Sequence, residues 1–358
     1  MPDPAYKRLA EHLHSFPNGF PPTDSGVELR LLARIFTPEE ADLASHLRLT
    51  PETPAQIAAR IGADPKDLAA RLKSMARAGQ IAATRSEDGL VFGALPFVFG
   101  IYEYQVGVLD KELAQLFEDY YREAFGQELA IQPPIHRVIP VEESVQVGLE
   151  IRPYESAVEI LDTAKAWGVL DCICRKQKAL IGDPCHHPID TCLAMSDTPG
   201  AFERNPVIRA LTRDEAVGVL QRAAEAGLVH SVNNAQQDVT YVCNCCTCSC
   251  GILRGIADLG IANVVARSAF VAQVDEGACV GCDLCLDRCQ FGALSLDGTA
   301  RVDESRCVGC GVCAPACPEK ALILVRRPTA DVLQPPQTEA EWRRARAEAR
   351  GIDLDAVL

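Results

Sequence analysis

Two copies of one cysteine pattern lie 28 residues apart in the last third of this 358-residue chain. Each copy reads Cys-x2-Cys-x2-Cys-x3-Cys. In iron–sulfur proteins with such a duplicated run, the first three thiolates of a copy hold one [4Fe-4S] cube and the fourth ligates the other cube. The spacing therefore predicts two clusters with exchanged fourth ligands: Cys279, Cys282, Cys285 and Cys317 for the first, and Cys307, Cys310, Cys313 and Cys289 for the second.

The repeat extends beyond the sulfurs, since Val-Asp-Glu precedes and Ala-Leu follows each cysteine run. We therefore expect each half to hold a strand, a cluster loop, a helical turn and a second strand, as in the pseudo-two-fold βαβ domain of bacterial ferredoxins. Gly281, Gly309 and Gly311 are predicted to let the backbone turn so that N–H groups face the cluster sulfurs. Gln290 replaces the usual proline after the fourth cysteine, which predicts a looser turn there. Structural zinc on the Cys-x2-Cys pairs is the disfavoured alternative.

Nine further cysteines lie in the middle of the chain, and thiolates are the ligands that iron–sulfur clusters and zinc prefer. They predict one or two additional [4Fe-4S] clusters, with zinc as the alternative, and their division between sites stays open. His186 and His187 are possible further ligands, although loop histidines beside prolines more often face solvent. The nine are Cys172, Cys174, Cys185, Cys192, Cys243, Cys245, Cys246, Cys248 and Cys250.

Three basic residues, Arg175, Lys176 and Lys178, directly follow the first Cys-x-Cys pair of this middle region. They are predicted cofactor-binding residues, because positive charge stabilises the reduced, more negative state of a cluster. Receiving an acidic partner or an anion is a second possibility, and ordinary surface charge is the alternative.

Composition limits the compartment and the partners. Apolar residues make up 48% of the chain, mean hydropathy is +0.02, and no stretch approaches the roughly 18 consecutive apolar residues of a membrane span. The first 22 residues lack the apolar segment of a secretory signal. Seventeen cysteines then indicate metal ligands in a reducing cytoplasm, and a net charge of −14 disfavours general nucleic-acid binding.

The N-terminal third has the pattern of a winged helix-turn-helix. Thr37 and Glu40 form a capping box, and residues 53–61 and 66–78 have the apolar spacing of helices. Residues 81–84 and 90–95 are predicted strands joined by a turn at 85–89. DNA is a possible partner of this part, because six basic residues between positions 53 and 85 outnumber two acidic ones. It is disfavoured, because such a basic stretch is more often a solvated face. The six are Arg60, Lys66, Arg71, Lys73, Arg77 and Arg85.

The whole order of motifs resembles a family of multidomain iron–sulfur proteins known as 4Fe-4S dicluster-domain proteins. The resemblance covers about residues 25–326 and rests on the winged helix, Ile-Cys-Arg-Lys-Gln-Lys at 173–178, Cys-Asn-Cys-Cys at 243–246 and the duplicated run. It implies electron transfer and leaves the partner open. The family commonly has further cysteines where this chain has Thr247 and Ser249, so a ligand set cannot be carried over from it.

These observations predict a multidomain α+β protein. We expect a winged-helix-like domain at 25–105, a helical connector at 106–134, a mixed α/β cysteine-rich domain at 135–270, a two-cluster ferredoxin domain at 271–327 and a Pro-containing linker with a helical tail at 328–358. The run 338–350 in that tail is expected to be a solvated surface helix.

The predicted function is cytoplasmic electron transfer, either alone or as a subunit of a larger oxidoreductase. No dinucleotide or phosphate-binding glycine motif is present, so single electrons should come from redox partner proteins, and no catalytic residue is assigned. The alternatives are a redox-sensing DNA-binding regulator and a reductase with a catalytic cluster in the middle domain.

Overall fold

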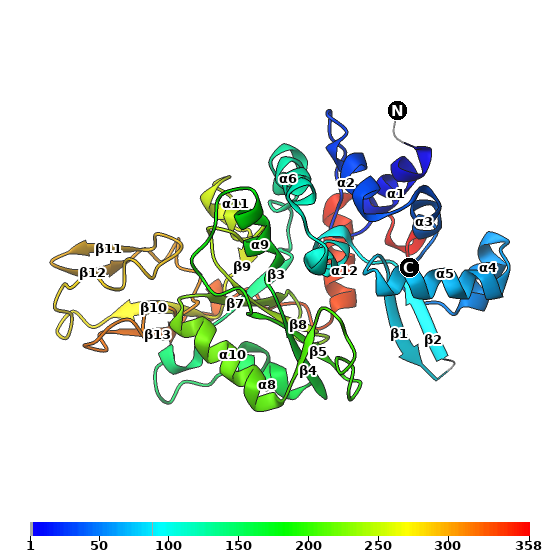
Figure 1. Ribbon diagram of the computed structural model, residues 1–358. Helices are drawn as coiled ribbons and strands as arrows, with labels where there is room; N and C mark the ends of the chain where they lie inside the picture. Colours follow the sequence, from blue (N-terminus) through cyan, green and yellow to red (C-terminus); the bar gives the residue numbers. More distant parts are fainter. Residues whose placement is uncertain (1–2, 88) are drawn as a thin grey trace. The chain divides into compact units, whose positions relative to one another are not determined.

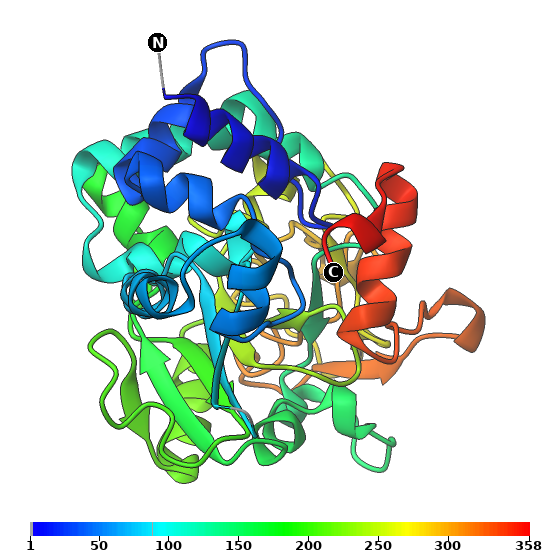
Figure 2. The same cartoon turned by 90° about the vertical axis from the view of Figure 1, so that its right-hand side faces the viewer.

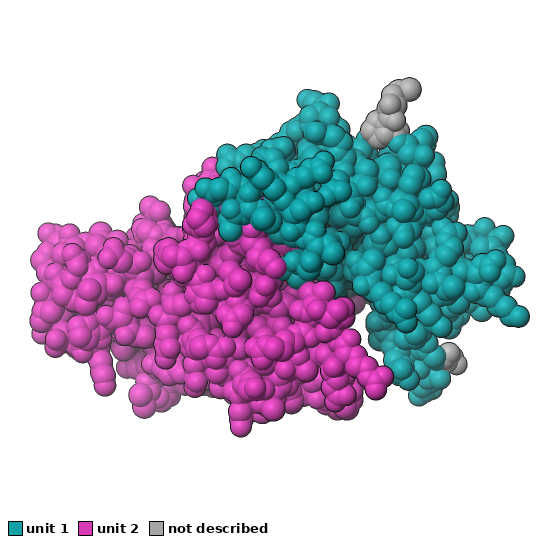
Figure 3. All heavy atoms as spheres, viewed as in Figure 1, with its two compact units in different colours: residues 1–131, 179–183, 343–358 teal, residues 132–178, 184–342 magenta. Residues whose placement is uncertain are grey.

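The computed structural model describes residues 3–87 and 89–358. Internal contacts divide the chain into two compact units, coloured in Figure 3. Unit 1 contains residues 1–131, 179–183 and 343–358, and unit 2 contains residues 132–178 and 184–342. The middle cysteines and the duplicated run thus belong to one compact unit.

Unit 1 begins, in sequence order, with α-helices that are followed by a β-hairpin (Figures 1 and 2). The capping boxes at Thr37 and Thr53 are formed, and the two helices expected at 53–61 and 66–78 are present within one residue of those bounds. The first two helices have no counterpart in the sequence expectations. The elements are α1 (Pro4–His14), α2 (Val27–Ile35), α3 (Pro38–Ala44), α4 (Pro54–Ile61), α5 (Pro65–Arg77), β1 (Ala82–Ser86) and β2 (Gly89–Gly93).

The hairpin is antiparallel, with Ala82 opposite Gly93, and Glu52 forms an isolated bridge to Phe92 at its edge. The expected turn at 85–89 includes residue 88, which lies outside the described residues. Two of the six bases that made DNA a possible partner contact the protein itself. Arg60 forms an ion pair with Glu52, and Arg71 donates to the carbonyl of Glu39 at 3.0 Å.

The rest of unit 1 buries an aromatic cluster in which the rings of Tyr102 and Phe117 stack at 3.8 Å. The prediction of a solvated tail helix was wrong. Arg346 of α12 (Glu339–Arg350) is fully buried, and its guanidinium donates to the carbonyls of Pro17 and Glu128, both at 2.9 Å. The remaining elements are η1 (Phe97–Ile101), η2 (Glu103–Gly107), α6 (Lys111–Tyr120), η3 (Tyr121–Phe125), α7 (Gly126–Glu128) and η7 (Leu354–Ala356).

Unit 2 is built on a seven-stranded sheet of order β6-β4-β5-β8-β7-β3-β9, in which only β3 and β9 pair in parallel. Helices α8 and α10 lie side by side and pack on this sheet (Figure 1). The strands are β3 (His136–Ile139), β4 (Ala166–Leu170), β5 (Cys192–Ser196), β6 (Arg209–Leu211), β7 (Val229–Asn233), β8 (Tyr241–Cys245) and β9 (Val265–Ala266). The helices are η4 (Glu142–Ser144), η5 (Pro153–Glu155), α8 (Ala157–Asp162), α9 (Ile173–Leu180), α10 (Arg213–Glu225), α11 (Arg254–Ala257) and η6 (Thr329–Asp331).

The pleat of this sheet separates its apolar core from its cysteines. Leu193 and Val242 are cross-strand partners and belong to the core that α8 and α10 cover. Because side chains alternate between the faces of a strand, Cys192, Cys243 and Cys245 point to the opposite face. The sheet therefore presents three cysteines on one surface.

The duplicated run forms two antiparallel pairs: β10 (Phe270–Val274) with β13 (Leu322–Arg326), and β11 (Leu294–Asp297) with β12 (Thr299–Val302). One cysteine loop joins β10 to β11 and the other joins β12 to β13, as the repeat predicted. Backbone hydrogen bonds attach this part to the middle segment, from Val141 to Cys310 and from Gln146 to Leu324, each at 2.9 Å. Within the described part of the chain, no helix has the length and apolar character needed to cross a membrane.

Candidate metal centres

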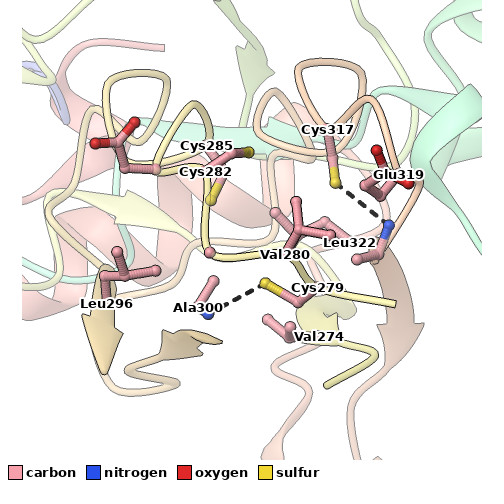
Figure 4. A pocket seen from close by; sticks show the side chains of 13 residues that line it. Val274, Cys279, Val280, Cys282, Cys285, Leu296, Ala300, Cys317, Glu319 and Leu322 are labelled. Atoms are coloured by element: carbon pink, nitrogen blue, oxygen red, sulfur yellow. Dashed lines mark hydrogen bonds between the residues drawn. The ribbon is translucent and has the colours of Figure 1, made fainter. Parts of the chain in front are cut away.

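The first ferredoxin cavity is lined by all four cysteines of the first predicted set (Figure 4). It encloses about 370 Å³ of empty space, part of it open to solvent. Cys279, Cys282 and Cys285 come from the loop after β10, whereas Cys317 comes from the loop before β13. The structure thus brings the fourth cysteine of the second copy to the first three of the first copy.

The second cavity has the reciprocal lining, with Cys307, Cys310 and Cys313 from the second copy and Cys289 from the first. Its empty space is about 340 Å³. The three cysteines of the second copy are all buried, at 8%, 9% and 7% exposure. In the first cavity, by contrast, Cys285 is buried and Cys282 is exposed.

Backbone N–H groups point at the sulfurs in both cavities. Ala300 donates to Cys279 Sγ at 3.4 Å and Ala321 donates to Cys317 Sγ at 3.3 Å (Figure 4). Ala293 donates to Cys289 Sγ at 3.3 Å in the second cavity. Such hydrogen bonds stabilise thiolate charge and tune the potential of a cluster.

The glycines expected to shape these loops have the left-handed backbone that the sequence predicted, with φ of +70° at Gly281, +73° at Gly309 and +78° at Gly311. Gly309 is the most constrained. A Cβ atom there would lie 2.1 Å from the carbonyl oxygen of Phe270. No larger residue fits at Gly309 without moving the backbone of β10.

The nine middle cysteines divide into a group of six and a group of three. In the group of six, thiol–thiol interactions run in a closed ring, and each thiol interacts with two others. The ring lies on the cysteine-bearing face of the sheet, beside the start of α9. Its members, in ring order, are Cys172, Cys174, Cys250, Cys245, Cys243 and Cys192.

Cross-strand pairing explains how distant cysteines meet in this six-cysteine ring. The β5–β8 register places Leu193 opposite Val242 and thereby Cys192 beside Cys243. Hydrogen bonds from Cys174 and Cys192 hold the pKa of Cys172 well below its usual range. The pKa of Cys245 is also lowered, to about 7, by hydrogen bonds from Cys243 and Cys250, whereas the pKa values of the other four ring thiols are raised. Thiolates, the form that binds metal, are therefore favoured at Cys172 and Cys245.

The other three cysteines join a histidine. The ligand atoms of Cys185, His187, Cys246 and Cys248 all lie within 4.8 Å of one another. Cys185 Sγ is 3.0 Å from His187 Nδ1 and 3.7 Å from Cys246 Sγ. We call this set the Cys3His tetrad. His187 was considered only as a possible ligand, and the pairing of Cys-x-His with Cys-x-Cys was the signal that could have found it.

Arg175 lies between the six-cysteine ring and the tetrad. Its side chain is 1% exposed and donates to Thr191 Oγ1 at 2.8 Å and to the carbonyl of Asn244 at 2.6 Å. Burial alone would lower the pKa of Arg175, but the negative charges of the neighbouring Cys172 and Cys246 thiolates raise it. Arg175 is thus a buried countercharge for sulfur and not ordinary surface charge.

The other two basic residues of this segment are Lys178 and Lys176. Lys178 is also buried, at 4% exposure. Lys176 is half-buried and forms an ion pair with Asp171 at 3.3 Å. Of the three predicted cofactor-binding residues, the structure brings Arg175 to the cysteines most directly.

Comparison with known proteins identifies only the C-terminal part of this chain. A family model described as a 4Fe-4S binding domain matches residues 272–295 and again residues 300–323. Among curated proteins, none matches the chain at a significant level. The two matches imply two [4Fe-4S] clusters. This chain is therefore an iron–sulfur protein with two [4Fe-4S] binding domains between residues 272 and 323.

Proposed function

We propose that this protein is a single-electron relay in which two ferredoxin clusters connect a partner protein to a third iron–sulfur cluster in the six-cysteine ring. The first cluster would be held by the cysteines of the first cavity and the second by those of the second cavity. The observation that carries the proposal is a direct connection between the second cavity and the middle cysteines. Gln290, which follows Cys289, accepts a hydrogen bond from the Thr247 N–H at 2.7 Å.

The first cavity is the proposed point of electron exchange with a partner. Val280 and Leu296 line this cavity and are 66% and 41% exposed, and neighbouring Leu284 is 50% exposed. Asp283 and Glu319, both exposed, line the same cavity. An apolar patch with an acidic rim favours a redox partner with a basic docking surface.

The second cavity is the proposed internal step. Its three second-copy cysteines are buried, so a cluster there is poorly placed to exchange electrons with a partner at the surface. From Cys289 the chain leads to Gln290, across the hydrogen bond to Thr247, and then by two residues to Cys245 of the ring. Electrons would follow this connection.

The ring supports a cluster and not a single ion. Each thiol of the ring has two neighbouring thiols. Among the described residues, however, only the tetrad brings three or more possible metal-ligand atoms within 4.8 Å of one another. No three sulfurs of the ring thus form the compact ligand set that a single ion needs. Thiolates are the usual ligands of iron–sulfur clusters.

An anaerobic iron and sulfide count combined with low-temperature EPR tests the proposal. We expect about twelve iron atoms per chain, since each [4Fe-4S] cube carries four. The second ferredoxin cluster and the ring cluster should also show magnetic coupling after full reduction. About eight iron atoms, or a third cluster with no coupling to either of the others, would refute the relay.

A further inference from the structure

We propose that the Cys3His tetrad binds one structural zinc ion, separate from the redox clusters. Zinc sites that serve structure are tetrahedral and have all four positions filled by protein, and Cys3His is one of their usual ligand sets. The tetrad supplies such a set from two segments: Cys185 and His187 precede β5, and Cys246 and Cys248 follow β8.

Four distances between ligand atoms of the tetrad, from 3.0 to 3.9 Å, are of the size that a single ion can bridge. Around tetrahedral zinc, Zn–S and Zn–N bond lengths place two sulfurs about 3.8 Å apart and a sulfur and a nitrogen about 3.5 Å apart. Cys185 Sγ is 3.7 Å from Cys246 Sγ and 3.0 Å from Cys248 Sγ. His187 Nδ1 is 3.0 Å from Cys185 Sγ and 3.9 Å from Cys248 Sγ.

A [4Fe-4S] cube fits the tetrad poorly. Each ligand of a cube binds a different iron and points away from the cluster centre, so the ligand sulfurs lie farther apart than around one ion. The ferredoxin cysteines of this chain have that wider arrangement. In the described part of the chain, the ligand atoms of the tetrad all lie within 4.8 Å of one another, and the four sulfurs of each ferredoxin cavity do not. The spacing of the ligand atoms therefore distinguishes the two kinds of site in unit 2.

Charge and packing around the tetrad also suit zinc. Three thiolates and a neutral imidazole on Zn²⁺ leave one negative charge, and the Arg175 guanidinium interacts with Cys246 and offsets it. Cys246 is 1% exposed and packs with Ala223 and Leu228, with Cys185 at the edge of the same cluster. The apolar backing keeps water from this side of the ion.

A zinc ion here would hold two loops together at the point where the relay enters the middle region. Thr247, whose N–H binds Gln290, lies between the tetrad members Cys246 and Cys248. The ion would therefore fix the position of this N–H group. The inference does not depend on a cluster in the six-cysteine ring, since the tetrad and the ring share no cysteine.

Metal analysis of purified full-length protein, with His187→Ala and His186→Ala prepared in parallel, tests the zinc site. His186 is the matched control, because it is exposed and stacks on His187 at 4.4 Å but is not a member of the tetrad. We expect about one zinc per chain in the wild type and in His186→Ala, and loss of that zinc with unchanged iron in His187→Ala. An iron content that falls by about four in His187→Ala would overturn the proposal.

Cobalt substitution covers the case in which His187→Ala fails to fold. Full-length protein produced with Co²⁺ in place of Zn²⁺ should show the EPR of high-spin tetrahedral cobalt and sulfur-to-cobalt charge-transfer absorption. His187→Cys, which keeps four soft ligands, should retain the ion with a shifted charge-transfer band. Wild-type protein that binds neither zinc nor cobalt in this geometry would also overturn the proposal.

Discussion

Gln290 and Thr247 are joined by a hydrogen bond of 2.7 Å that links the ferredoxin part of unit 2 to the loop carrying the tetrad. The amide nitrogen of Gln290 also donates to the carbonyl of Gly227 at the end of the α10 segment. The side chain of Gln290 therefore bridges two segments of unit 2 beside the turn after Cys289. A proline at this position could make neither hydrogen bond.

Gln290→Leu is expected to destabilise unit 2 by about 1–3 kcal/mol, because the N–H of Thr247 and the carbonyl of Gly227 lose their partner. It should also slow electron transfer between the second ferredoxin cluster and the ring cluster. Anaerobic thermal unfolding and freeze-quench EPR measure the two effects. Gln273→Leu is the control, because Gln273 is an exposed residue of β10, and equal effects of the two substitutions would show that the hydrogen bonds of Gln290 carry no special role.

Cys289→Ser should remove or alter the cluster of the second cavity and leave that of the first cavity intact, because Cys289 lines only the second. Cys317→Ser should have the opposite effect. EPR and iron analysis of both variants distinguish the two clusters. Selective loss of the first cluster in Cys289→Ser would show that the fourth ligands are not exchanged.

Gly309→Ala should prevent stable assembly of the second cluster. The added Cβ would meet the Phe270 carbonyl oxygen at 2.1 Å and Ser268 Oγ at 2.2 Å, so β10 must move. Gly298→Ala is the matched control, since Gly298 has a similar φ of +72° but no atom within 4 Å of a Cβ. It should cost only about 1–2 kcal/mol of left-handed strain. Cluster absorbance after anaerobic purification compares the two, and similar losses would contradict the steric argument.

The patch around the first cavity should control exchange with a basic redox partner. Replacing Val280 and Leu284 by serine is expected to slow reduction of cytochrome c, a basic one-electron acceptor, several-fold without changing the iron content. Stopped-flow mixing measures the rate of cytochrome c reduction, and the fall of this rate with increasing salt measures the electrostatic contribution to it. Leu333→Ser is the control, because Leu333 is 86% exposed and does not line the cavity. A rate that is insensitive to the patch would place electron exchange elsewhere.

His136 should make the protein less stable at acid pH. It is 1% exposed, and burial lowers its pKa from 6.5 to about 3. The unfolded state therefore takes up a proton first as pH falls below 6.5, and stability is lost from there down to about pH 3. The expected loss from this group between pH 7.5 and 5.5 is about 1.4 kcal/mol.

The test for His136 compares unfolding of the wild type and His136→Gln at pH 7.5 and at pH 5.5. Glutamine does not titrate, so the variant should lose less stability on acidification than the wild type. The comparison at each pH removes the contribution of His230, another buried histidine whose pKa is lowered by burial. Equal losses in both proteins would mean that His136 is protonated in the folded state.

The local features of this fold could be predicted from the sequence, because they depend on neighbouring residues. Capping boxes such as that of Thr212 and Glu215, at the start of α10, form between residues three apart. The eight ferredoxin cysteines could be assigned to two cavities, because the spacing within the duplicated run is that of a two-cluster ferredoxin. Helix α1 was missed, although the Asp3 cap, Pro4 and the spacing of Leu9 and Leu13 are signals of a helix.

The division of the middle cysteines could not be predicted, because it depends on contacts between distant segments. Cys192 meets Cys243 only through the register of β5 and β8, and a slip of one strand by one residue would put the two cysteines on opposite faces of the sheet. Cys185 reaches Cys246 across 61 residues of sequence. Spacing along the chain contains no signal for the contact between Cys192 and Cys243, whereas the Cys-x-His and Cys-x-Cys pairs of the tetrad are a local signal that does not say which segments meet.

The burial of Arg346 has a consequence for the order in which the nascent protein matures. Unit 1 needs residues 343–358, whereas every cysteine of the chain belongs to unit 2 and leaves the ribosome earlier. At a synthesis rate of about 5–20 residues per second, unit 2 is exposed before Arg346 can bind the carbonyls of Pro17 and Glu128. Metal loading of the nascent chain can therefore begin while the N-terminal helices still lack their last partner.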